Sequence, residues 1–235
     1  LVGAGQGVYV EAADGSVLVA QAAELAVHPA SVSKVPTTLA LLRKLGADHR
    51  FATRFAASGP LQDGVLQGDL VVEGSGDPFF VDENPLLVLI ALQDQGVRRV
   101  AGDVAVRGPF LFNWESAGDA ARLRRALAGR IPPATWSAVR AAAATRGDVP
   151  AKQPSLVFGA AKLAGSAAPL LLATHRSQPL VPLVKALNGY SNNIFAPFAD
   201  AAGGIATVQA MARESVPPAL RDAIGFLGWL ALIDG

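Results

Sequence analysis

The sequence predicts an α/β (α+β) fold, in which a helical domain and part of an antiparallel sheet are interrupted by a small inserted α+β domain. Three patterns predict this class. Apolar residues alternate around a turn dipeptide near the N-terminus, helical spacing follows, and a strand–helix–strand pattern comes next. Of the 235 residues, 51% are hydrophobic and 17% are charged, which excludes a disordered chain and provides a sizeable core.

The first expected element is a hairpin over residues 7–20. Valines at strand spacing flank Asp14-Gly15, a dipeptide whose glycine tolerates the positive φ of a tight turn. A helix follows, because four apolar residues recur at intervals of four, three and three and are expected to form its buried face: Val35, Leu39, Leu42 and Leu45. Gly46 ends this helix, and Pro36 is tolerated near its start, where a missing N–H costs little.

The next stretch predicts the inserted domain. Two strands are expected between Phe51 and Gly74 around Gln62-Asp63-Gly64, and a loop follows over 74–78. A short helix over 85–96 and a strand over 100–106 then complete a βαβ-like unit.

The second half of the chain is harder to interpret. Residues 116–177 are rich in Ala, Pro and Gly, and the clearest feature there is a basic run interpreted as a solvated helix face: Arg122, Arg124 and Arg125. Helices are expected again over 179–187 and 192–201, and no internal repeat is evident.

Composition limits the function. Twenty Lys and Arg balance 19 Asp and Glu, so no overall field favours nucleic acid or an anionic membrane. No transmembrane segment is expected, because every long apolar window contains Pro, Gly or charge. The absence of cysteine excludes a disulfide framework and thiolate metal ligands.

Several isolated residues have ordinary structural interpretations. Three histidines lack the spacing of metal ligands, so no metal centre is expected: His28, His49 and His175. Three tryptophans are interpreted as core residues rather than as a carbohydrate-binding surface: Trp114, Trp136 and Trp229. Two aspartates are interpreted as turn formers: Asp77 and Asp103.

The tetrapeptide Ser31-Val32-Ser33-Lys34 is the most informative motif. Residues three apart on a helix share a face, so a hydroxyl and an amine come within hydrogen-bond reach. A partly desolvated lysine can take the serine proton, and the first helical turn directs free N–H groups toward a developing oxyanion. The alternative, in which Ser31 is an N-cap and Lys34 is solvated, remains open at this point.

A second motif, Ser191-Asn192-Asn193, offers a hydroxyl that can relay protons and an amide that can hold a substrate. Its alternative is an Asn-rich turn with a helix cap. In this order, the two motifs match the first two signatures of serine acyl-transferases that bind penicillin.

Longer segments extend the match. The active-site helix is matched by His28 to Lys34, followed by Thr37-Thr38. An inserted domain is matched by Asp63 to Leu70, Gly76-Asp77-Pro78 and Val100 to Val104. A second catalytic segment is matched by Pro179 to Asn193. Over roughly 1–110 and 175–235 the chain therefore resembles the D-alanyl-D-alanine carboxypeptidase/endopeptidase family, the class C low-molecular-mass (DacB-like) penicillin-binding proteins.

This resemblance implies a penicillin-binding-protein/β-lactamase-like transpeptidase fold. Residues 1–50 and 175–235 would form a discontinuous catalytic domain without its C-terminal strands, and residues 51–174 the insert. It further implies that Ser31 is the acylated nucleophile, Lys34 its general base, Ser191 the proton relay and Asn193 the group that holds the substrate amide.

The implied function is cleavage of D-Ala-D-Ala bonds or D-alanyl cross-links in peptidoglycan stem peptides, in the periplasm or cell wall. β-Lactams would be covalent inhibitors, and neither a cofactor nor nucleic acid is expected as a partner.

The chain departs from the family pattern at one point. The family carries a Lys-Thr-Gly strand after its Ser-x-Asn segment, but no such tripeptide follows Asn193 here, so acylation is expected to be weak. One alternative is a non-catalytic or truncated family member that binds peptidoglycan or protein, or forms an oligomer, through the open edge of its hairpin. Another is an unrelated helix-rich interaction domain.

Overall fold

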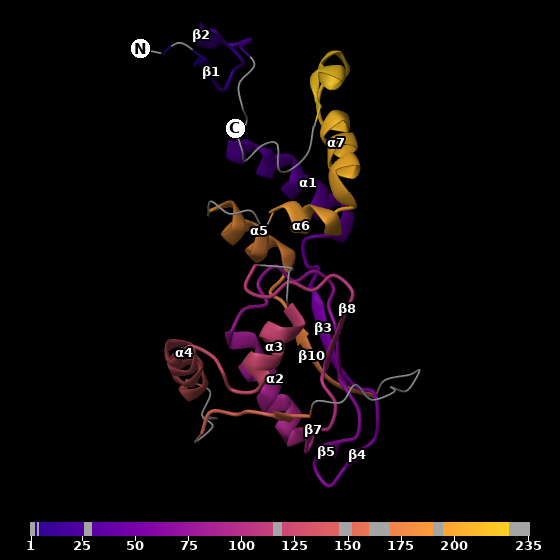
Figure 1. Ribbon diagram of the computed structural model, residues 1–235. Helices are drawn as coiled ribbons and strands as arrows, with labels where there is room; N and C mark the ends of the chain where they lie inside the picture. The colour runs from indigo at the N-terminus through magenta and orange to yellow at the C-terminus, as the bar shows by residue number, and fades with distance from the viewer. Residues whose placement is uncertain are drawn as a thin grey trace.

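The computed structural model describes residues 3, 5–25, 30–114, 119–145, 152–159, 170–189 and 195–225. These residues form an elongated molecule in which a hairpin, a group of helices and a larger α/β unit follow one another along one axis (Figure 1). Among the described helices, none combines the length and apolar character needed to cross a bilayer.

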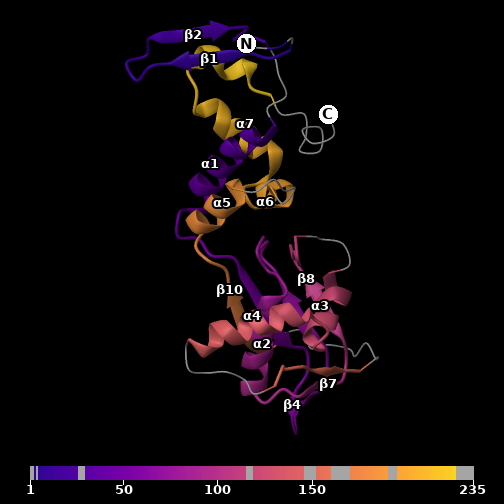
Figure 2. The same cartoon turned by 90° about the vertical axis from the view of Figure 1, so that its left-hand side faces the viewer.

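The N-terminal hairpin is confirmed. Strand β1 (Val8–Glu11) pairs antiparallel with β2 (Val17–Gln21), and Gly15 has a φ of 84° in the turn between them. Among the described residues these two strands form a sheet of their own, and most of their side chains are exposed. Figure 2 shows the hairpin at one end of the molecule.

The helical unit is built on α1 (Lys34–Leu45), which follows a 3₁₀ turn (Ala30–Ser33) and ends at Gly46, as predicted. Three helices pack with it: α5 (Leu180–Asn188), α6 (Phe195–Ala201) and α7 (Gly204–Glu214), which a second 3₁₀ turn follows (Pro218–Ala223). They share a core that includes Leu41, Leu183 and Phe198. The predicted helices over 179–187 and 192–201 correspond to α5 and α6.

The predicted buried face of α1 is wrong in part. Val35 is 65% exposed, whereas Ala40 and Leu41 are fully buried. Residues 39–42 are all apolar, so hydrophobic spacing does not select one face of this helix, and packing against its neighbours decides.

Among the described residues, the α/β unit that the sequence predicts as an insert contains two four-stranded sheets. The larger has the order β10–β3–β6–β8, made by Leu170–Arg176, Ala52–Ala57, Leu70–Glu73 and Val104–Arg107. The smaller has the order β4–β5–β7–β9, made by Leu61–Gln62, Val65–Leu66, Arg99–Val100 and Val157–Phe158. Three helices pack in this unit: α2 (Glu83–Asp94), α3 (Asp119–Leu127) and α4 (Pro133–Ala144).

The βαβ-like unit is confirmed, because β6 and β8 are parallel and α2 lies between them in sequence. The stretch over 51–74 nevertheless holds four strands rather than two. Leu66 to Leu70 and Val100 to Val104 each carry a Gly-Asp step from the small sheet to the large one. The two steps are joined, since the Asp103 N–H donates to Asp69 Oδ1 at 2.8 Å.

The basic run on α3 is only partly a solvated face. Arg125 is exposed, but the Nε of Arg124 lies 2.7 Å from Asp103 Oδ1, and its guanidinium lies 5.4 Å from the centre of the Phe158 ring. Arg124 therefore links α3 to both sheets.

Among the described residues, one hydrophobic core lies in the inserted unit and another in the helical unit. Trp114 is 58% exposed, so its interpretation as a core residue is wrong. At the junction, Phe51 N–H donates to Ser177 Oγ and Ser177 N–H to the Phe51 carbonyl, both at 2.9 Å. The sequence predicts two domains, one made of residues 1–50 and 175–235 and the other of residues 51–174. This division stays a prediction, and we propose the contact of Phe51 with Ser177 as the boundary between the two domains.

Candidate active site

Lys34 is the first residue of α1, and its side chain is buried although it carries an amine. Its Nζ donates to the carbonyl oxygen of Leu187 at 3.4 Å, in the last turn of α5. Carbonyls at a helix C-terminus carry partial negative charge, so they accept hydrogen bonds from an amine. The alternative of a solvated Lys34 is therefore wrong.

Ser31 lies on the 3₁₀ turn before α1 and is exposed. A 3₁₀ turn has three residues per turn, so positions 31 and 34 share a face, as the motif predicts. The N-cap position of α1 is Ser33, without a side-chain capping bond, so the interpretation of Ser31 as the N-cap is also wrong.

Ser191 and Asn193 lie outside the described residues, as does His28. The described chain on either side of 190–194 is nevertheless held close to α1. On one side, Asn188 Nδ2 donates to Thr38 Oγ1 at 3.1 Å. On the other, Phe198 of α6 belongs to the same core as Leu41 of α1. The structure thus brings Lys34 to the end of α5, and Ser31 lies three residues before Lys34 on the preceding turn.

Sequence analysis missed a buried polar cluster in the insert. His175 of β10 lies 3.3 Å from Asp77 and 3.3 Å from Asn84, and the side chains of His175 and Asp77 are 14% and 2% exposed. Asp77 is also the predicted turn former, because its Oδ1 accepts the Phe79 N–H at 2.9 Å. These residues are far apart in sequence, so no local motif signals the contact.

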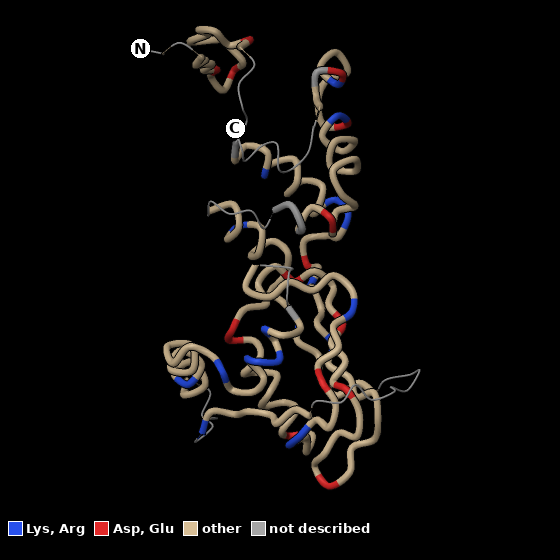
Figure 3. Tube along the Cα trace, in the orientation of Figure 1, with Lys and Arg blue, Asp and Glu red and all other residues tan. Residues whose placement is uncertain are grey.

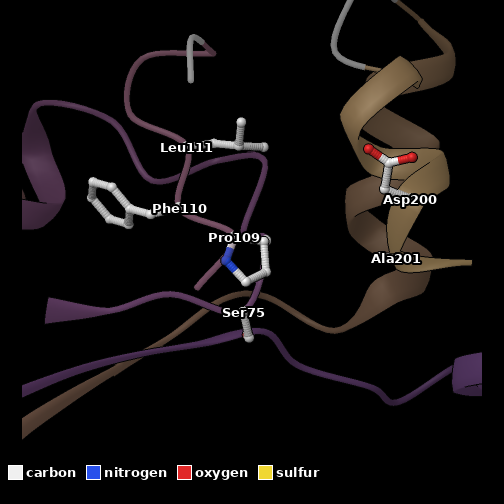
Figure 4. Close-up of a pocket in the computed structure, with 7 residues that line it drawn as sticks. Ser75, Pro109, Phe110, Leu111, Asp200 and Ala201 are labelled. Carbon is white, nitrogen blue, oxygen red and sulfur yellow. The ribbon is translucent and has the colours of Figure 1, made fainter. Parts of the chain in front are cut away.

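A cavity of about 320 Å³ lies between the insert and the C-terminal end of α6 (Figure 4). Leu111 and Pro109 line one side, and Asp200 and Ala201 the other. Gly203 lies two residues after Ala201, which lines the cavity. A Cβ atom built on Gly203 would lie 2.7 Å from Nζ of Lys44, so this side of the cavity is close to the C-terminal end of α1. The cavity is therefore at the opposite end of α1 from Ser31 and Lys34.

Clusters of charge and of metal-ligating residues do not suggest another site in the described part of the chain. Lys and Arg are interspersed with Asp and Glu along the trace (Figure 3). Within the described ranges, no group of three or more His, Asp or Glu residues is arranged to hold a metal ion.

Residues 1–110 match the sequence model of the D-Ala-D-Ala carboxypeptidase 3 (S13) family. The D-alanyl-D-alanine carboxypeptidase of Actinomadura sp. strain R39 is 40% identical over 98 residues, which are 41% of this chain and 18% of the relative. The D-alanyl-D-alanine carboxypeptidase DacB of Haemophilus influenzae is 32% identical over 77 residues, 33% of this chain and 16% of the relative. The chain thus matches less than a fifth of either relative's length.

Solved structures give the same relationship at the level of the fold. The penicillin G-acylated predatory endopeptidase Bd3459 of Bdellovibrio bacteriovorus, in complex with immunity protein Bd3460, has a TM-score of 0.63 at 24% identity, covering 81% of this chain and 50% of that one. Penicillin-binding protein 4 (dacB) of Haemophilus influenzae, complexed with a β-lactam, has a TM-score of 0.53 at 16% identity, covering 86% and 64%.

These comparisons show the fold first: a mixed α/β fold similar to those of the penicillin-binding peptidases named above. The resemblance to the DacB-like D-alanyl-D-alanine carboxypeptidases is then confirmed over residues 1–110.

Proposed function

We propose that the chain is a serine D-Ala-D-Ala carboxypeptidase/endopeptidase-type penicillin-binding protein that acts on peptidoglycan stem peptides through an acyl-enzyme on Ser31. The observation that carries this proposal is the contact of buried Lys34 with the Leu187 carbonyl. Leu187 precedes Ser191 by four residues, so their Cα atoms are at most about 14 Å apart. The proposed relay residue Ser191 therefore follows, by only four residues, the α5 carbonyl that Lys34 contacts.

In the proposed reaction, Lys34 takes the proton of Ser31 Oγ, and Oγ attacks the carbonyl carbon of the penultimate D-alanine. The Ser31 backbone N–H stabilises the oxyanion as one of its donors. Ser191 passes a proton to the departing D-alanine amine while Asn193 holds the substrate amide. Water then hydrolyses the Ser31 ester. Serine and lysine supply nucleophile and base, so these steps require no cofactor.

A β-lactam follows the first half of this path. Oγ of Ser31 attacks the lactam carbonyl, the ring C–N bond breaks, and the acyl group stays on Ser31. The substrate is a cell-wall polymer, so the proposed compartment is the periplasm or cell wall.

The open hairpin supports a second candidate, a non-catalytic module that binds peptidoglycan or another protein. β1 and β2 pair only with each other among the described residues, and Leu18 is 65% exposed. An unpaired strand edge can add a further strand.

A fluorescent penicillin separates the two candidates. Labelling of the wild-type chain that is lost in Ser31→Ala and kept in Ser33→Ala supports the enzyme, provided that circular dichroism shows all three chains folded. Ser33 is the matched control because it stands two residues away on the same turn. No labelling of the folded wild-type chain at saturating reagent supports the binding module.

A further inference from the structure

The cavity between the insert and α6 has no part in the proposed reaction, because it lies at the opposite end of α1 from Ser31 and Lys34. One wall comes from the insert, and the other from the last turn of α6 (Figure 4). Clefts between two packed units are frequent ligand sites. The volume of about 320 Å³ is near the low end of the range for such sites, so it suits a small ligand.

The insert wall is held rigidly. The Gly76 N–H donates to the Pro109 carbonyl at 2.7 Å, and Ser75 Oγ accepts the Ala52 N–H at 2.7 Å. Gly76 has a φ of 90°, where a residue with a side chain is strained. A Cβ atom built there would have Cε1 of Phe51, at 4.0 Å, as its nearest neighbour. Paired backbone and a missing side chain therefore keep this wall open.

The opposite wall carries negative charge. Asp200 lies in the last turn of α6, across the cavity from Leu111 (Figure 4). A helix C-terminus already has partial negative charge, so a carboxylate there is unfavourable without a cation. Asp200 is the one titratable residue among the described residues that line the cavity, and no ion pair joins it to a described Lys or Arg. The lining therefore favours a cationic ligand.

We propose that this cavity binds a primary alkylammonium group with a short aliphatic chain. The ammonium group donates hydrogen bonds to Asp200, and the chain lies against the apolar wall of Leu111 and Pro109. A metal ion fits poorly, because a single carboxylate supplies too few ligands. A quaternary ammonium prefers an aromatic cage, whereas the ring of Phe110 belongs to the core of the insert. Such binding is independent of acylation at Ser31.

The test titrates the full chain with n-pentylamine and follows backbone amide signals by NMR at low ionic strength, where attraction between charges is screened least. We expect a dissociation constant of about 1–20 mM. The amide signals of Gly76 and Gly203 should both shift, because Gly76 lines the insert wall and the Gly203 N–H donates to the Asp200 carbonyl at 2.9 Å.

Four variants, each checked for folding by circular dichroism, test the role of charge and shape. Asp200→Asn keeps the shape of the carboxylate and should weaken binding at least about fivefold. Asp63→Asn removes an exposed carboxylate from a distant turn and should bind as wild type. Lys44→Met removes the amine near Gly203, a competing positive charge, so it should bind more tightly. Ala201→Leu fills part of the cavity and should weaken binding without a change of charge.

Two probes identify the source of the amine. Binding of n-pentylamine alone points to a free amine, and binding of Nα-acetyl-lysine methylamide points to a peptide side chain; either supports the alkylammonium site. The proposal would be overturned if neither probe shifted the Gly76 and Gly203 signals up to about 50 mM, or if Asp200→Asn bound as tightly as wild type. Equal binding of pentanoate, an anion of the same length, would also contradict it.

Discussion

The Nε2 atom of His175 lies 3.3 Å from Oδ2 of Asp77, inside the insert. The same nitrogen lies 3.3 Å from Nδ2 of Asn84, whose Oδ1 accepts the Val81 N–H at 2.7 Å. One ring nitrogen thus faces an acceptor and a donor, and it can satisfy only one of them at a time. The contact joins β10, the 74–78 loop and the start of α2.

Asp77→Ala removes this contact and leaves the Phe79 N–H without its acceptor. Because these groups are buried, we expect the free energy of unfolding to fall by about 1–3 kcal/mol, measured by denaturant titration. Asp94→Ala, at an exposed position on α2, is the control and should change it by less than about 0.5 kcal/mol. Equal stability of the two variants would contradict a structural role for Asp77.

Asn188→Ala removes the hydrogen bond to Thr38 that holds the end of α5 on α1. The bond is exposed, so the expected loss of stability is about 0.5–1.5 kcal/mol. Hydrogen exchange at the Gly189 amide, which donates to the Ala186 carbonyl, should become faster. Penicillin labelling, where present, should slow as the chain before Ser191 loosens.

Thr38→Val removes the other partner of this bond and provides the second arm of a double-mutant cycle. The free energy of unfolding of the double variant should be no lower than that of the less stable single variant. Fully additive losses would show that the two side chains do not act on each other.

Arg124→Ala breaks the ion pair with Asp103 and the contact with Phe158. Both charged side chains are more than a third exposed, so a modest loss of about 1 kcal/mol is expected from thermal or chemical unfolding. Arg125→Ala is the matched control on the same helix, at an exposed position. If both substitutions lower the free energy of unfolding equally, Arg124 does not link α3 to the sheets.

Asp14 sets a pH dependence in the hairpin turn. Hydrogen bonds from the Ser16 hydroxyl and then the Ser16 N–H lower the pKa of its carboxyl group. Because the pKa is lower in the folded hairpin, the carboxylate favours the turn above the unfolded pKa, and this contribution disappears as pH falls through the folded pKa. In an NMR titration, Ser16→Ala should raise the pKa of Asp14. An unchanged titration curve would contradict the assigned cause.

Local signals in the sequence were enough for several elements. Asp14-Gly15 marks the hairpin because only a turn with positive φ fits there, and Gly46 marks the end of α1 for the same reason. The spacing of Ser31 and Lys34 predicts a shared face in any helical turn. The strands over 51–74 were harder to predict from the sequence, because β4 and β5 have only two residues each and carry no measurable periodicity.

What the sequence determined by itself is the N-terminal hairpin, α1, the βαβ-like unit, α5 and α6, and the Ser31–Lys34 motif, because turn chemistry and side-chain period act over a few residues. Only the tertiary structure decided that Lys34 is buried against Leu187, that Asp77 meets His175 and that Trp114 is exposed. Those outcomes depend on which distant segments pack together, and packing free energy is shared among many residues rather than encoded in any one stretch of the chain.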